Sequence, residues 1–181
     1  MSEYPSGSVE DREMLAEMSP GKMLDFFFLQ VRNLWRVDGL YFLGIEQRFG
    51  TEAATAIDAG VWETMAKIEA KSLRRMFKIS ENTDISTITN LLRKSSWALD
   101  QPFKTVEVSG KKAVLRVDQC RTQETRLKKG LSEFPCKKVR FGYLKNFAKT
   151  LNSTVEVNCL FCPPDRHPPN LWCKWEFILR K

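Results

Sequence analysis

The chain has 181 residues, of which 43% are hydrophobic, and a formal net charge of +7. This length and composition suffice for one buried core, so we expect one domain. No apolar run approaches the ~20 residues of a membrane span, which excludes a spanning helix. The basic residues are scattered over amphipathic segments without a concentrated stripe, so a nucleic-acid partner is not expected.

The N-terminal segment, residues 1–18, is polar and is expected to form a flexible tail before a single domain of residues 19–181. It lacks the basic-then-apolar pattern of a signal peptide, so we expect a cytoplasmic protein. In that reducing compartment, clustered cysteines favour metal binding over disulfides.

The first part of the domain, residues 19–101, is predicted to be helical. Ser19 followed by a proline is typical of a helix start. Asp38 and Gly39 are expected to end this helix, and a second short helix is expected to end at Gly50. The segment therefore begins with two separate helices.

Two further helices are predicted before the chain changes pattern. Apolar side chains recur at helical spacing over residues 51–79. Asp84 is typical of an N-cap and is expected to start a helix that continues through Leu99.

The second part, residues 102–181, is expected to contain hairpins and short helices. Apolar residues alternate on both sides of Gly110, which predicts a hairpin there. Helices are expected over residues 121–129 and between 136 and 152. Two last strands follow, on which Cys159 and Cys173 face the apolar side. The predicted class is α+β, with a helical layer packed on a small antiparallel sheet.

Cysteines are concentrated in this second part. Two of them form a C-x-x-C pair, which can wrap one metal ion because a short turn points both sulfurs inward. Four sulfurs satisfy the tetrahedral preference of zinc and close the site to water, which makes it structural. The predicted structural zinc ligands are Cys136, Cys159, Cys162 and Cys173.

Other interpretations of these cysteines stay open. A redox pair usually opens a helix, whereas Pro163 and Pro164 follow this pair and cannot continue one. The thiols can also be plain core residues, since free cysteine is often buried. His167 can replace one sulfur, although as a lone loop histidine it is expected to be exposed.

Two stretches of the sequence resemble a family of uncharacterised cytosolic proteins of anaerobic bacteria and archaea. They are the upstream run WRVDGLYFLGIEQRFGTEAATAIDAGVWE, and CRTQETRLKKGLSEFPCKKV with CLFCPPDRHPPNLWCKWEF. The group is similar to four-vinyl-reductase-type domains and to sensor domains of phenol-responsive transcription activators. It also resembles the hydrolases named for aminothiazoline carboxylic acid.

This resemblance implies a zinc site and a fold. The activator sensors hold structural zinc with three cysteines and a glutamate, and their Cys, Glu and Cys match Cys136, Cys159 and Cys162. A further cysteine of their last strand corresponds to Cys173. The implied fold is the ligand-binding fold of nitric-oxide signalling and Golgi transport proteins, with a small molecule between helices and sheet. Such domains commonly form homodimers through their helices.

A small-molecule site is predicted at aromatic and acidic residues of the helical part. Aromatic walls with a few polar groups are the usual form of such a site, although aromatics at helical spacing are also typical of a core. Nearby arginines can bind a carboxylate. The predicted ligand-binding residues are Trp35, Asp38, Tyr41, Glu46 and Trp62.

Three functions follow from these patterns and from the resemblance, which alone implies the hydrolase. The first is a stand-alone, zinc-stabilised sensor-like module that binds a small molecule. The second is a hydrolase that opens a small sulfur-containing ring, for which Cys120 or the pair Asp38 and Glu46 are the candidate groups. The third is a scaffold or assembly subunit. A single histidine nearly excludes a catalytic triad.

Overall fold

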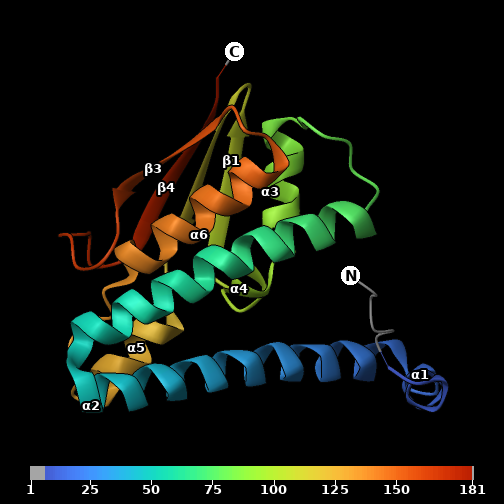
Figure 1. Cartoon of the computed structure of the whole chain (residues 1–181), viewed down its shortest axis with the longest axis horizontal. Coiled ribbons are helices and arrows are strands. Elements are labelled where there is room, and N and C mark those ends of the chain that lie inside the picture. Colours follow the sequence, from blue (N-terminus) through green and yellow to red (C-terminus); the bar gives the residue numbers. More distant parts are fainter. Residues whose placement is uncertain (1–6, 181) are drawn as a thin grey trace.

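The fold combines six helices with four strands in the part of the chain that this computed structural model describes, residues 7–180 (Figure 1). The helices are α1 (Val9–Ala16), α2 (Pro20–Met76), α3 (Ile85–Leu92), α4 (Ser96–Leu99), α5 (Arg121–Lys128) and α6 (Cys136–Leu151). The strands are β1 (Lys104–Ser109), β2 (Lys112–Val117), β3 (Val155–Phe161) and β4 (Cys173–Leu179). The predicted α+β class is confirmed. None of the described helices is long and apolar enough to cross a membrane.

Helix α2 is bent into two arms at Gly50. The first arm covers residues 20–49 and the second covers 51–76. Gly50 has φ 84° and ψ 164°, a conformation that is essentially restricted to glycine. Ser19 caps the start of α2 and accepts a hydrogen bond from the backbone N–H of Lys22.

The predicted helix end at Asp38 and Gly39 is wrong, because the first arm continues through both residues to the bend. A glycine inside a helix costs only about 1 kcal/mol, which tertiary packing can offset. The Asp38 carboxylate accepts a hydrogen bond from the distant Trp62 side chain.

One other expectation about the helices needs correction. The N-terminal tail predicted over residues 1–18 contains α1, which Ser8 and Asp11 cap reciprocally and which has no buried residue, and its flexibility stays a prediction. Residues 1–6 lie outside the described residues. The helix expected from Asp84 to Leu99 is two helices, because Ser95 caps a new start by accepting from the N–H of Ala98. Asp84 does cap α3 as predicted.

The four strands form one antiparallel sheet in the order β1-β2-β4-β3. The predicted hairpin is confirmed, since Ser109 pairs with Lys112 around Gly110, which has φ 57°. The face of β4 that carries Cys173, Trp175 and Phe177 is buried, as the alternation predicted.

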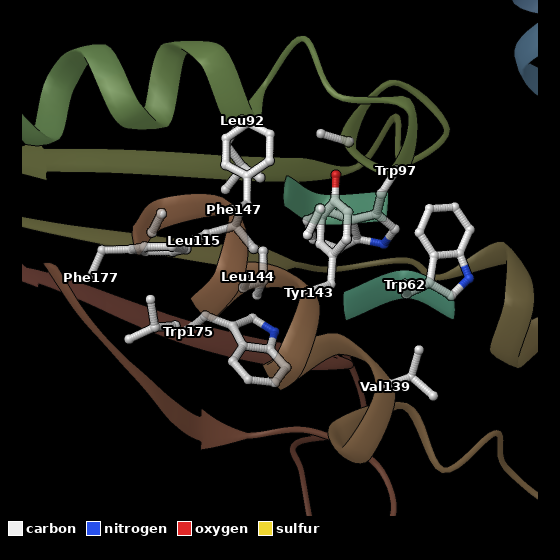
Figure 2. Close-up of a cluster of buried hydrophobic side chains, with 14 of the residues drawn as sticks. Trp62, Leu92, Trp97, Leu115, Val139, Tyr143, Leu144, Phe147, Trp175 and Phe177 are labelled. Carbon is white, nitrogen blue, oxygen red and sulfur yellow. The ribbon is translucent and has the colours of Figure 1, made fainter. Parts of the chain in front are cut away.

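Helix α6 covers this buried face, and the second arm of α2 packs on the opposite side of α6 (Figure 1). Trp175 and Phe177 of the sheet meet Leu144 and Phe147 of α6 in the core (Figure 2). Gly142 permits close approach of the two helices, because a Cβ there would lie 2.5 Å from Oε1 of Glu63. The first arm is the outermost layer.

Candidate functional site

A cavity of about 500 Å³ lies between the first arm of α2 and the segment that runs from α5 to α6. Its aromatic lining consists of Trp35, Phe42, Trp97 and Phe134. Its carboxyl groups are Asp38, Asp58 and Asp100. Its cationic groups are Arg32, Arg36, Arg121, Arg126, Lys129 and Arg140. A concave apolar wall with convergent polar groups is typical of a small-molecule site.

Arg140 stands at the inner wall of this cavity. It belongs to α6 and only 4% of its surface is exposed. Its guanidinium carbon lies 4.7 Å from the Trp97 ring centroid, 5.1 Å from Tyr143, 5.5 Å from Trp62 and 5.6 Å from Trp35. Cation–π attraction to these rings offsets part of the cost of burying the charge.

Asp38 and Trp62 connect the two arms of α2 beside Arg140. The indole Nε1 of Trp62 donates a hydrogen bond to Oδ1 of Asp38 at 3.0 Å. The Trp62 ring is stacked on Trp35 with a centroid distance of 4.6 Å. Trp35 in turn donates from its Nε1 to the backbone oxygen of Ser96, which attaches α4 to the first arm.

Asp58 of the second arm is the other carboxyl group near Arg140. Burial and, to a smaller extent, the negative charge of Asp38 raise its pKa to about 7, although the Arg140 cation opposes this shift. Burial also raises the pKa of Asp38. Two carboxyl groups with raised pKa values therefore face one cavity.

Buried polar contacts hold α5 against the rest of the cavity wall. Arg126 of α5 binds Glu46 through two hydrogen bonds of 2.8 and 2.9 Å. Gln123 donates to the backbone oxygen of Phe134 at 2.9 Å and accepts from its N–H at 2.7 Å. Asp100 pairs with Arg121 and lies 3.5 Å from Arg32.

Three cysteine thiols meet where α6, the end of β3 and the start of β4 converge. The Cys162 thiol forms hydrogen bonds with Cys136 and Cys173, which raise its pKa. The hydrogen bond from Cys162, helped by the Arg140 cation, lowers the pKa of Cys136. Cys120 lies beside this group, and burial raises the pKa of its thiol to about 12.

Cys159 lies on β3, close enough to the other thiols that, besides burial, Cys173 and Cys136 contribute to raising its pKa. It is half-buried on β3 and lines a second, open groove of about 890 Å³ beside Lys137 and Asp165. Burial raises the pKa of its thiol to about 11.

The donor chemistry of the cysteines suits zinc, but their arrangement is not that of a formed metal site. Within residues 7–180, no group of three or more His, Cys, Asp or Glu side chains is positioned to hold a metal ion. His167 contacts other groups, with its Nε2 3.5 Å from Glu133 and its ring against Trp172. Its side chain is only 12% exposed, so the expectation of an exposed loop histidine is wrong, because Trp172 and Glu133 cover the ring. The four-cysteine zinc site stays a prediction.

A protein-family model described as a family of unknown function, DUF6125, matches residues 16–179 of the chain. The protein is a member of DUF6125. The match covers every element from α2 to β4, and so includes all the walls of the cavity. A search of curated proteins finds no match to this sequence. The resemblance to sensor and hydrolase families stays a prediction.

The five predicted ligand-binding residues of this DUF6125 protein do not form one cluster. Trp35 and Asp38 line the cavity, and Trp62 lies directly behind them. Tyr41 lies on the outside of the first arm and is 71% exposed. Glu46 is occupied by Arg126 and by a hydrogen bond from Thr51.

Two residues that line the DUF6125 cavity, Arg140 and Asp58, were not predicted from the sequence. One signal for Arg140 was present. It stands three residues before Tyr143 and seven before Phe147, and so within the apolar stripe of a predicted helix, where an arginine is unusual. Asp58 carried no comparable signal, because its environment depends on Asp38 across the bend.

Proposed function

We propose that this DUF6125 protein is a sensor-like module that binds a small molecule in the cavity between the first arm of α2 and α5–α6. One observation carries this proposal: an aromatic cavity of about 500 Å³ that contains a buried guanidinium. Cavities of this size and lining commonly enclose small ligands.

The experiment is native mass spectrometry of freshly purified protein, compared with the denatured chain. A small-molecule mass that is present only in the native spectrum supports the proposal. Gly39→Leu places a side chain at the cavity wall, where a Cβ has no atom within 4 Å, and should abolish the adduct. Gly44→Leu, at an equally open position of the same arm but outside the lining, should retain it. Equal adducts in both variants would contradict the proposal.

We also propose that zinc stabilises the module and that two copies associate through the first arm of α2. The convergent thiols of Cys136, Cys162 and Cys173 support the zinc. The first arm exposes apolar side chains that a second copy of the same arm can cover, including Leu24 at 58%, Phe28 at 46% and Leu34 at 44%. Light scattering should give twice the monomer mass, and Phe28→Glu should shift it to the monomer.

A hydrolase is the second candidate, and the carboxyl pair Asp38 and Asp58 favours it. A carboxyl group with a pKa of about 7 can donate and accept a proton at neutral pH. Cys120 is less suited to be a nucleophile, since its pKa is raised to about 12. Hydrolysis of aminothiazoline carboxylic acid that disappears in Asp58→Asn would support an enzyme, and an inert wild-type protein would exclude this substrate.

A further inference from the structure

Arg140 has hydrogen-bond donors that the described part of the chain leaves unused. Its Nε and Nη1 are buried and have no hydrogen-bond partner among residues 7–180. A buried donor without an acceptor is costly, and more so when it is charged. Burial of the whole side chain to 4% exposure means that bulk water does not supply these acceptors freely.

The surroundings of Arg140 orient it and satisfy it only in part. The Cys136 thiol forms a hydrogen bond with the guanidinium, but Nε and Nη1 stay without a partner. The rings of Trp35, Trp62, Trp97 and Tyr143 surround the guanidinium and offer it no oxygen acceptor. Asp38 and Asp58 feel its charge, but within the described residues neither forms an ion pair with it at 4.0 Å or less. Asp38 already accepts from Trp62.

Other unpaired polar atoms gather at the same cavity. Eight buried side-chain nitrogen or oxygen atoms lack a hydrogen-bond partner in the described part of the chain, and five of them belong to cavity-lining residues. These five are Nε and Nη1 of Arg140, Oε1 of Gln101, Nε of Arg32 and Oδ1 of Asp100. The last two lie 3.5 Å apart as an ion pair without a hydrogen bond, so the atoms without any partner are those of Arg140 and Gln101. Buried polar groups are normally paired, so these atoms indicate a place where another molecule supplies the partners.

The charge of the lining selects the kind of molecule. Six cationic side chains and three carboxyl groups line the cavity, which leaves an excess of positive charge. Glu46 neutralises Arg126, and the excess remains after this pair is removed. A concave site of this sign attracts anions.

We propose that Arg140 binds the carboxylate of a small organic acid whose flat apolar body lies against Trp35, Phe42, Trp97 and Phe134. The proposal rests on the proposed binding function and names its ligand class. The carboxylate supplies acceptors for the unused donors, and hydrogen bonds between a guanidinium and a carboxylate are among the strong ones. The aromatic wall supplies the contact area for a planar body.

The test compares acids with their neutral isosteres on the full-length protein. Benzoate, phenylacetate and indole-3-acetate are each titrated against the matching primary amide by calorimetry. At least one acid should bind roughly tenfold or more tightly than its amide, as expected for a charged hydrogen bond in a buried site. Inorganic phosphate should not match the acids, because it has no apolar body.

Variants of Arg140 test whether this residue causes the preference for acids over amides. Arg140→Met should remove the difference between acid and amide, and Arg140→Lys should retain part of it because the charge remains. Lys145→Met, a change of the same kind at an exposed position of α6, should leave the preference unchanged. If Arg140→Met does not fold, the comparison of acid with amide on the wild type and on Arg140→Lys still tests whether Arg140 causes the preference for acids.

Two results would overturn the inference. One is equal binding of acids and amides to the wild-type protein, and the other is an acid preference that survives in Arg140→Met. If acids and amides bind equally and Gly39→Leu blocks both, the binding function stands and only the role of Arg140 is wrong. If no acid binds the wild type at millimolar concentration, the ligand class is wrong, and the native mass spectrum judges the binding function separately.

Discussion

Trp62 donates a hydrogen bond to Asp38 at 3.0 Å although the two residues are 24 positions apart in the same helix. The contact exists because Gly50 bends α2 and returns the second arm beside the first. The hydrogen bond holds the Asp38 carboxylate at the wall of the cavity and fixes the Trp62 ring beside Arg140.

Removal of this hydrogen bond should weaken the fold. Trp62→Phe leaves Asp38 without its donor and should lower the free energy of unfolding by about 1–3 kcal/mol in urea denaturation. A double-mutant cycle with Asp38→Leu should show a coupling energy of about 0.5–3 kcal/mol. Strictly additive effects would mean that the two side chains do not act together.

The bend at Gly50 should tolerate only glycine. Gly50→Ala forces a side chain to adopt φ 84°, which costs roughly 1–3 kcal/mol of stability. Gly44→Ala is the matched control, because it lies inside the first arm with open space around it, and it should stabilise by about 0.5–1 kcal/mol. Equal effects of the two changes in urea denaturation would argue against a bend at residue 50 that requires glycine.

The ion pair of Glu46 and Arg126 should contribute to stability rather than to chemistry. Both side chains are largely buried, and Glu46→Gln leaves a buried guanidinium without its charge partner, which typically costs about 3–5 kcal/mol. Thermal denaturation should show a large loss. The exposed pair Glu156 and Arg180 is the control, and Glu156→Gln should have a much smaller effect.

Stability should fall as the pH rises toward neutrality, owing to Asp58. Its pKa is raised from 3.8 to about 7 in the folded protein, so the folded state binds a proton that the unfolded state has already released. This contribution is complete below the unfolded value and is lost as pH rises through about 7. Burial is the main cause of the shift, Asp38 and Cys136 strengthen it, and Arg140 and a hydrogen bond from Trp62 oppose it.

Urea denaturation between pH 4 and pH 8 provides the measurement. Asp58→Asn should reduce the decline in stability over this range. The difference in free energy of unfolding between Asp58→Asn and wild type should therefore favour the variant more at pH 8 than at pH 4. An unchanged pH profile in Asp58→Asn would show that another group is responsible.

Zinc binding should depend on the convergent thiols of Cys136, Cys162 and Cys173. Metal analysis of protein purified without chelator should find one zinc per chain, and Cys136→Ser or Cys162→Ser should lose both the metal and thermal stability, because binding energy at such sites becomes folding energy. Cys159→Ser and Cys120→Ser show which flanking thiol supplies a fourth ligand. Unchanged metal content and stability in both Cys136→Ser and Cys162→Ser would make the zinc prediction wrong.

Local patterns determined much of the fold. Alternation around Gly110 predicted the hairpin, the caps Ser19 and Asp84 predicted two helix starts, and the order of these elements predicted the α+β class. Such features depend on neighbouring residues along the chain, so the sequence by itself carries them. The break expected at Asp38 and Gly39 was wrong because a local helix-breaking tendency is weak and distant packing overrides it.

Only the tertiary structure decided which side chains share the cavity. Arg140 on α6, Asp38 on the first arm and Asp58 on the second arm become neighbours through one bend in α2 and the packing of α6. The same holds for the thiols, where three segments bring Cys136, Cys162 and Cys173 together and leave Cys159 at a different groove. The spacing of residues along a chain does not encode distances across such contacts, because they depend on the bend angle and on which helix faces meet.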